Sequence, residues 1–325
     1  MTRVVAPCRL HFGLFHVPLD GHTHWPDGTP VRQFGGVGLM VQAPAVAVRA
    51  EPAEDWSADG SHSERAVEFA RRFVRDFEPA KDPRFRVTVE ACPPEHIGLG
   101  VGTQLGMAVG KAVAGELDAV ICPTELARAV GRGQRSAIGV HGFGGGGLIV
   151  DGGKASGTTV GARVSRTEWA TDWRIVLARP RASTAWHGDR ERMAFARSRH
   201  PEQVARTTER LCRLALFGLV PALIERDFPA FGGALYEFNR AAGEPFMAEQ
   251  GGPYSSAEVE EVVRAARAFG SPGAGQSSWG PTVFSICRDQ DEALRLAAVL
   301  RTRFPNLENL TVTTASNSGA DYVSD

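Results

Sequence analysis

The chain has 325 residues, of which 43% are hydrophobic and 22% are charged, and its formal net charge is -1. This balance is typical of a globular protein and argues against disorder along the whole chain. A net charge near zero gives no global attraction to nucleic acid or to an anionic membrane, so we expect neither partner. The length predicts two domains.

The five cysteines are widely spaced, and no two have the CxxC spacing of a zinc or redox site. They predict free thiols in a reducing compartment. Arg9 and His11 interrupt the N-terminal segment where a signal peptide has an unbroken apolar core. The longest apolar stretch, 214–224, is shorter than the roughly 20 residues that a membrane span needs. We therefore expect a soluble cytoplasmic protein.

The first half of the chain alternates between strand and helix patterns. Residues 37–48 and 85–89 have the composition and alternation of strands. Between them, Ser61 and Glu64 form a capping box for a helix that ends before Pro79. A helix of small residues is expected after residue 104, and Thr124 is expected to cap a short helix. Residues 139–147 predict a glycine-rich loop, which is followed by a strand at 148–150.

Residues 152 to about 171 are small and polar, so we place a domain boundary there and expect domains at 1–165 and 166–325. Two or three helices are expected in 201–242, and Ser255 with Glu258 is expected to cap another. The expected strands of this half are 174–178, 282–286 and 310–314, with a helix at 291–301 before the last one. This alternation predicts a compact α+β domain.

The stretch Gly98-Leu99-Gly100-Val101-Gly102-Thr103-Gln104 carries the most chemical information. Its alternating glycines permit positive φ values and leave backbone N–H groups uncovered, which makes a nest for an anion. Thr103 stands where the N-cap of the next helix would be, and a helix N-terminus favours a phosphate. The alternative is a tight turn that lets the strand and the helix approach closely. The pattern matches neither a Walker A loop nor a GxGxxG fingerprint.

Two further glycine-rich stretches occur at 139–147 and 273–281. In the second of these, Gln276, Ser277 and Ser278 can hydrogen-bond to phosphate or sugar oxygens. Trp279 can either stack on a flat ring or pack in a core.

Residues 7–13, 98–104 and 273–280 resemble, in order and spacing, the three motifs of the GHMP small-molecule kinases. The resemblance spans nearly the whole chain. It implies an α+β fold with a ribosomal-S5-type N-terminal domain, a ferredoxin-like C-terminal domain and an active site between them. Val101 and Gly102 stand at the serine positions of the kinase loop, so a hydroxyl that would bind magnesium is missing. His141 stands where the kinases carry a catalytic Asp.

The run Gln276-Ser277-Ser278-Trp279-Gly280-Pro281-Thr282, together with 9–13, 98–104, 131–141 and 150–153, resembles a non-kinase branch of this superfamily. That branch is the β-ribofuranosylaminobenzene 5'-phosphate synthases of methanopterin biosynthesis. The resemblance implies condensation of phosphoribosyl pyrophosphate with 4-aminobenzoate or 4-hydroxybenzoate and release of pyrophosphate and CO2. It implies Mg²⁺ arriving with phosphoribosyl pyrophosphate, no requirement for ATP, and a homodimer.

For this reaction, His141 and His11 are the candidate acid–base groups, since His titrates near neutrality; for each, the alternative is a structural hydrogen bond. Asp151 is the candidate magnesium ligand; the alternative is a turn residue at the end of a strand. The residues predicted to bind phosphate or substrate are Arg9, Gly98, Gly100, Gly102, Thr103, Gln104, Arg135, Gln276, Ser277, Ser278 and Trp279.

Two other functions stay open. One is an ATP-dependent GHMP-type kinase that phosphorylates a sugar or an alcohol, which would need a carboxylate near the γ-phosphate. The other is a catalytically inactive protein of the same fold that binds a ligand.

Overall fold

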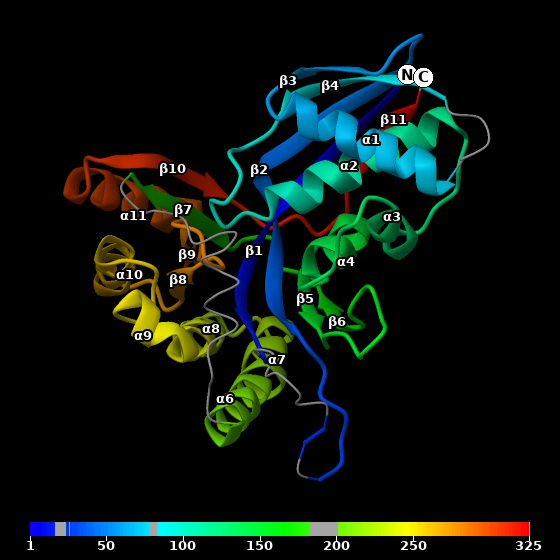
Figure 1. The fold of residues 1–325 in the computed structure, drawn as a ribbon. Helices are drawn as coiled ribbons and strands as arrows, with labels where there is room; N and C mark the ends of the chain where they lie inside the picture. Colours follow the sequence, from blue (N-terminus) through cyan, green and yellow to red (C-terminus); the bar gives the residue numbers. More distant parts are fainter. Residues whose placement is uncertain (17–23, 26, 78–82, 182–200, 325) are drawn as a thin grey trace.

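The computed structural model describes residues 1–16, 24, 25, 27–77, 83–181 and 201–324. Within these ranges the chain forms two sheets with helices packed on them, as Figure 1 shows. The fold is therefore α+β, as predicted. No helix in these ranges is long and apolar enough to cross a bilayer.

The larger sheet has seven strands in the described part of the chain, in the order β11-β1-β2-β4-β3, with β5 paired to β2 and β6 to β5. The two longest strands, β1 and β2, pair antiparallel from Thr2↔Ala50 to Leu14↔Gly36. The strands of this sheet are β1 (Thr2–Leu14), β2 (Gly36–Pro52), β3 (Ser57–Gly60), β4 (Phe85–Ala91), β5 (Leu148–Asp151), β6 (Arg163–Thr167) and β11 (Asp321–Ser324).

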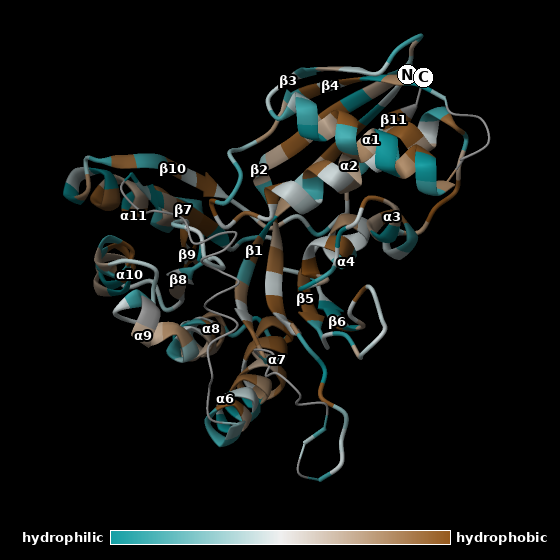
Figure 2. Ribbon diagram, in the orientation of Figure 1, coloured by the Kyte–Doolittle hydropathy of each residue, from teal (hydrophilic) through white to brown (hydrophobic). Residues whose placement is uncertain are grey.

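Helix α2 (Val101–Glu116) packs on β1 and β2, and its buried face consists mostly of Ala, Gly and Val. Small residues let this helix approach the sheet closely. The amphipathic helix α1 (Ser63–Phe77) lies on α2 with Phe69 and Phe73 turned inward. Figure 2 shows hydrophobic residues concentrated along β2 and β5, whereas hydrophilic residues are frequent on α1. The two remaining helices of this half are α3 (Pro123–Ala129) and α4 (Ile138–Gly145).

Among the described residues, the smaller sheet has four strands in the order β10-β7-β9-β8, and every neighbouring pair is antiparallel. The strands are β7 (Arg174–Pro180), β8 (Ala274–Gln276), β9 (Val283–Cys287) and β10 (Leu307–Thr313). The helical segments of this half are α6 (Pro201–Arg213), η1 (Leu214–Leu219), α7 (Val220–Ile224), α8 (Phe228–Gly243), η2 (Glu244–Phe246), α9 (Met247–Gln250), α10 (Ala257–Phe269) and α11 (Gln290–Arg303).

Strand β1 connects the two halves. Its Phe12 ring lies 4.9 Å from the ring of Phe284 on β9, and both side chains are buried. The buried hydrophobic cluster is continuous from the larger sheet through Phe12 to Phe231 and Phe238 of α8. The C-terminal part of β1 is consequently held at the junction of the two sheets, next to the segment that follows β8.

The structure differs from the sequence analysis at residues 139–147, where a glycine-rich loop was predicted. Most of this stretch is helix α4 (Ile138–Gly145), which packs against β1, β2 and α2. A Cβ on Gly142 would lie 2.2 Å from Met40 Sδ, so the glycine permits close helix packing rather than an exposed turn. The loop prediction was wrong because the neighbour that requires a glycine here, Met40, is distant in the sequence, so the local pattern does not reveal the packing.

The element boundaries shift in smaller ways. Helix α3 is capped by Cys122 rather than Thr124, and α10 is capped by Ser256, whose hydroxyl accepts from Val259 N. The division into residues 1–165 and 166–325 stays a prediction. Strand β6 crosses that position, and the C-terminal strand β11 pairs with β1 in the larger sheet.

Candidate functional site

Two adjoining cavities lie where β1 passes between the two sheets. The main pocket has a volume of about 460 Å³, and its lining comes from β1, residues 131–136, α8, residues 243–254 and the segment from Gln276 to Trp279. The loop pocket has a volume of about 260 Å³ and lies over residues 98–103. The residues that line both pockets are Arg9, Thr103, Arg132, Arg135, Ser278 and Trp279.

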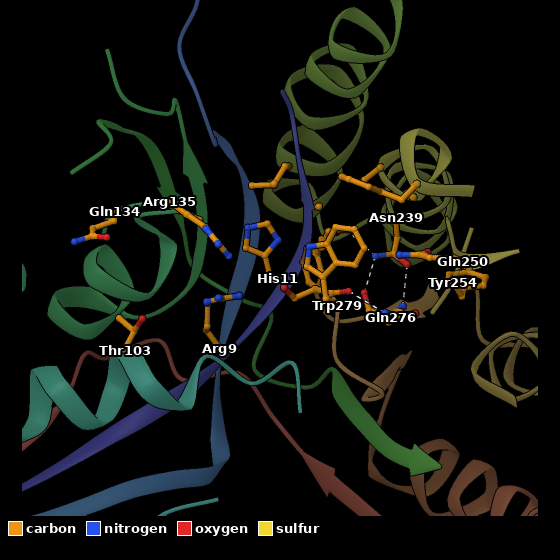
Figure 3. A pocket seen from close by; sticks show the side chains of 18 of the residues that line it. Arg9, His11, Thr103, Gln134, Arg135, Asn239, Gln250, Tyr254, Gln276 and Trp279 are labelled. Carbon is orange, nitrogen blue, oxygen red and sulfur yellow. Dashed lines mark hydrogen bonds between the residues drawn. The ribbon is translucent and has the colours of Figure 1, made fainter. Parts of the chain in front are cut away.

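Figure 3 shows how the side chains of the main pocket are arranged. The guanidinium groups of Arg9 and Arg135 point into the same space beside His11. Asn239, Gln276 and Tyr254 lie on the opposite side, and Trp279 lies between the two groups. The main pocket thus has a cationic end and a neutral end.

Trp279 also packs edge-on against Phe246, with 4.3 Å between the ring centroids and 68° between the planes. Its ring is partly exposed and lines both pockets. A partly exposed indole at this position provides an aromatic wall for a flat ligand.

Ser277 connects the three motif segments at 7–13, 98–104 and 273–280 by hydrogen bonds. Its hydroxyl donates to Gly98 O (2.6 Å) and accepts from His11 N (2.9 Å), and the side chain is fully buried. The next residue continues the connection, because Ser278 N donates to His11 O at 2.9 Å. Ser277 therefore positions the walls of the pockets and does not line either of them.

Asn239 holds the same segment from the side of α8. Its Nδ2 donates to Phe12 O (2.6 Å) and to Gln276 O (2.8 Å), and its Oδ1 accepts from Gln276 N (2.9 Å). The Gln276 side chain accepts from Ser255 N and donates to Ser278 O. Both amides are buried with their hydrogen bonds formed inside the protein, so we assign them mainly to positioning.

The loop pocket is built on the start of α2. Gly100 is the N-cap, with φ 66 and ψ 20, so the helix begins at Val101 and not after Thr103. Thr103 lies in the first turn of the helix and lines both pockets. The first N–H groups of a helix have no intrahelical partner and favour an anion. The glycine-rich stretch is thus a helix start, and the N-cap lies three residues earlier than the expected Thr103.

Arginines surround this helix start. The loop pocket is lined by four of them, Arg9, Arg65, Arg132 and Arg135, and by one carboxylate, Glu95, within the described chain. Glu95 pairs with Arg65. Burial and then the neighbouring Arg65 lower the pKa of Arg132 to about 10, so its guanidinium stays charged at neutral pH. The lining carries an excess of positive charge.

His11 lines the main pocket and is 4% exposed. Burial, and then the charge of Arg9, lower the pKa of its imidazole well below the usual value of 6.5. The ring is therefore neutral near neutral pH. It can donate and accept hydrogen bonds there but supplies no positive charge.

The structure brings most of the predicted site residues together. Arg9, Thr103, Arg135, Ser278 and Trp279 line both pockets. His11 and Gln276 line the main pocket. Gly98, Gly100 and Gly102 line the loop pocket.

Besides Ser277, three predicted residues line neither pocket. Gln104 is fully buried, and its Nε2 donates to Gly139 O (2.9 Å), which ties α2 to α4. His141 lies on α4, where its Nε2 donates to Gly161 O (2.8 Å). This side of α4 faces Gly161, and His141 lines neither pocket, so its position supports the structural alternative.

Asp151 is the third of these residues. It is fully buried, with Oδ2 accepting from Ala137 N (2.6 Å) and Oδ1 accepting from Gly153 N (2.9 Å). Burial raises the pKa of this carboxyl. Its hydrogen bonds fix the start of α4 and the turn after β5, so its position supports the structural alternative rather than a magnesium ligand.

The sequence analysis missed Arg65, Glu95, Arg132 and Asn239. Three of them come from segments outside the quoted motifs, and only folding brings them to the pockets. Arg132 had a local signal, because it stands between Gly131 and Gly133. The two glycines permit positive φ values on both sides of Arg132, so they indicate a tight turn at this position.

Comparison with known proteins places this site in a family. The chain is 31% identical over 303 residues to the beta-ribofuranosylphenol 5'-phosphate synthase of Methanothermobacter thermautotrophicus, covering 86% of this chain and 87% of the relative. It is 29% identical over 306 residues to the protein of the same name from Archaeoglobus fulgidus, covering 88% of each. The chain belongs to the beta-ribofuranosylphenol 5'-phosphate synthase family. It is accordingly an enzyme, and its class is pentosyltransferase.

The fold of this synthase family member is shared with the GHMP superfamily. The model of the GHMP kinases C-terminal family matches residues 219–306. Homoserine kinase from Cytophaga hutchinsonii superimposes with a TM-score of 0.67 at 14% identity, over 99% of this chain and 97% of the kinase. Mevalonate diphosphate decarboxylase from Staphylococcus aureus gives 0.69 at 15% identity, over 100% and 99%. The predicted GHMP-type fold is confirmed.

Proposed function

We propose that this protein condenses phosphoribosyl pyrophosphate with 4-aminobenzoate or 4-hydroxybenzoate and releases pyrophosphate and CO2, in tetrahydromethanopterin biosynthesis. Membership in a family of ribofuranosylphenol phosphate synthases supports a reaction that joins a ribose phosphate to an aromatic ring. The observation that carries the proposal is the pair of adjoining pockets. One is small and rich in arginine, and the other is larger, with a neutral end and an aromatic wall.

The charge distribution of the two pockets supports a spatial arrangement of the substrate groups. Phosphate groups fit the loop pocket, where the start of α2 and the arginines supply hydrogen-bond donors and positive charge. The ribose then extends into the main pocket. The aromatic ring lies beyond it, against Trp279 and toward Asn239 and Tyr254, where the lining is neutral.

The bonds formed and broken in this condensation balance without a group that accepts a proton. The ring carbon that bears the carboxylate donates an electron pair to the anomeric carbon, and the C–O pair leaves with pyrophosphate. The C–C pair to the carboxyl group returns to the ring as CO2 departs, which restores aromaticity. No proton is added or removed, so a neutral His11 is compatible with the chemistry. Positioning alone can lower such a barrier by about 7–11 kcal/mol.

Magnesium is proposed to enter with phosphoribosyl pyrophosphate. Within the described residues, no group of three or more His, Cys, Asp or Glu could hold a metal ion. Glu95 and Thr103 line the loop pocket and carry oxygen atoms, the ligand type that a hydrated magnesium ion takes when its other ligands come from phosphates. Bound there, the ion would neutralise part of the phosphate charge. The homodimer and the absence of an ATP requirement stay predictions.

The proposal is tested with purified protein, phosphoribosyl pyrophosphate, magnesium and carboxyl-labelled 4-aminobenzoate or 4-hydroxybenzoate, without ATP. Release of labelled CO2 and of pyrophosphate in equal amounts is expected with at least one of the two acids. A reaction without the acid measures hydrolysis of phosphoribosyl pyrophosphate and is the control.

If neither product forms with either acid, the proposal fails. Consumption of ATP with a sugar or alcohol acceptor would then support the kinase alternative. Absence of turnover with any of these substrates, alongside binding of phosphoribosyl pyrophosphate, would support an inactive ligand-binding protein.

A further inference from the structure

Arg132 lies on a tight turn that directs its side chain to the junction of the two pockets. The turn follows α3, and the flanking Gly131 and Gly133 have φ values of 68° and 78°. Arg132 N donates to Ala127 O at 2.6 Å, which fixes the turn to the helix. Only glycine adopts such values at little cost, so the sequence of this turn favours one direction for Arg132. The side chain lines both pockets.

The guanidinium group of Arg132 is held in place by an aromatic ring and by the start of α2. Its centre lies 4.9 Å from the ring centroid of Phe69. Its Nη2 lies 3.1 Å from the point where a Cβ on Gly102 would stand, and Glu95 Oε1 lies 2.9 Å from that point. Gly102 therefore leaves room for a charged cluster directly over the first turn of α2.

The positive charge in this cluster exceeds the negative charge available to it. Glu95 is the single carboxylate that lines the loop pocket in the described chain, and it already pairs with Arg65. Arg132 Nε is buried without a hydrogen-bond partner among the described residues. Burying a positive charge without full compensation costs free energy, and an anion bound in the loop pocket would offset this cost electrostatically.

We propose that Arg132 is a catalytic residue that contacts the pyrophosphate group of phosphoribosyl pyrophosphate and stabilises it as the bond to the anomeric carbon breaks. This inference rests on the proposed function. As the C–O bond breaks, its electron pair moves onto the pyrophosphate oxygen, and the ring carbon supplies the pair for the new C–C bond. A guanidinium fixed before the reaction stabilises this charge without reorganising. Its forked donors suit two phosphate oxygens at once.

The test separates the two anionic parts of the substrate. Binding of magnesium pyrophosphate and of ribose 5-phosphate is measured by calorimetry for the wild type, Arg132→Gln and Arg132→Lys. The Gln variant is expected to bind pyrophosphate at least about tenfold more weakly and ribose 5-phosphate within about twofold of the wild type. Its kcat for CO2 release is expected to fall about 10²-fold, with little change in KM for the aromatic acid. The Lys variant should recover part of both losses.

Arg128→Gln is the matched control, because Arg128 lies in the last turn of α3, just before the turn that carries Arg132, and is exposed and outside both pockets. It should leave pyrophosphate binding and kcat unchanged. Unchanged pyrophosphate binding in Arg132→Gln, or equal weakening of both ligands, would overturn the inference. If Arg132→Gln does not fold, Arg132→Lys decides by the same comparison. If the wild type binds pyrophosphate through Arg132 but releases no CO2, the proposed reaction fails while the pyrophosphate contact stands.

Discussion

Among the single residues, His11 lines the main pocket and has an imidazole whose pKa is lowered. Its buried ring is held neutral, whereas the unfolded chain binds a proton near the ordinary pKa of 6.5. The stability that depends on this group is therefore present above about pH 6.5 and is lost as the pH falls toward the lower pKa of the folded state. We expect His11→Asn to lose less unfolding free energy than the wild type between about pH 7.5 and about pH 5. Urea unfolding at both values measures the difference, and an equal loss in the two proteins would contradict it.

A substitution at Asp151 distinguishes a structural role of this carboxylate from a role as a magnesium ligand. An Asn at this position keeps one carbonyl oxygen but turns an NH2 group toward the N–H of Ala137 or Gly153, which now donate to the carboxylate. We expect Asp151→Asn to lower the unfolding free energy by about 1–3 kcal/mol, as measured by urea unfolding. The magnesium concentration for half-maximal activity should not change. A strong shift in that concentration with unchanged stability would restore the metal assignment.

At the scale of elements, the sequence predicted most strands and helices because their apolar spacing is local. The segments 85–91, 174–180 and 290–303 form the expected strands and helix, with ends that differ by a few residues. Glycine-rich stretches were harder to interpret. At 98–104 the glycines form the start of a helix, whereas at 139–147 they form the helix itself. Glycine content alone does not separate these cases, because the partner that requires the small residue is distant in sequence.

Helix α4 offers a direct test of that explanation. Adding a methyl group at Gly142 would place it 2.2 Å from Met40 Sδ and 2.5 Å from Met40 Cγ. We expect Gly142→Ala to destabilise the fold by about 1–3 kcal/mol through overpacking, as measured by chemical unfolding. The matched control is Gly233→Ala on α8, where nothing lies within 4 Å of the new Cβ. That change should stabilise the protein by about 0.5–1 kcal/mol, because Ala favours helix. A similar response of the two variants would show that α4 is not packed as described.

At the scale of the whole molecule, the site depends on contacts that no single motif reveals. The motifs at 7–13, 98–104 and 273–280 predicted one common site, and the structure brings them together around β1. The roles within the motifs were less predictable. Ser277 and Gln104 carry hydrogen-bonding groups suited to a substrate, yet both are fully buried and satisfy backbone groups instead. Arg65 and Glu95 reach the loop pocket from α1 and the segment before Gly98, so only the folded chain shows them as site residues.

The Ser277 hydroxyl makes the most direct contact in this assembly, since it links the C-terminal half of the chain to His11 N and Gly98 O of the N-terminal half. Ser277→Ala leaves both backbone groups without this partner in a buried place. We expect a loss of about 1–3 kcal/mol in unfolding free energy and faster hydrogen exchange at the His11 amide. Ser278→Ala is the control for stability, because Ser278 is exposed and bonds to His11 O through its backbone N. Unfolding and exchange measured on both variants decide the point. If Ser277→Ala and Ser278→Ala have the same unfolding free energy and the same exchange rate, the Ser277 hydroxyl is not needed to hold the two sheets together. The walls of the pockets are then fixed by packing around Phe12 and Phe284 alone.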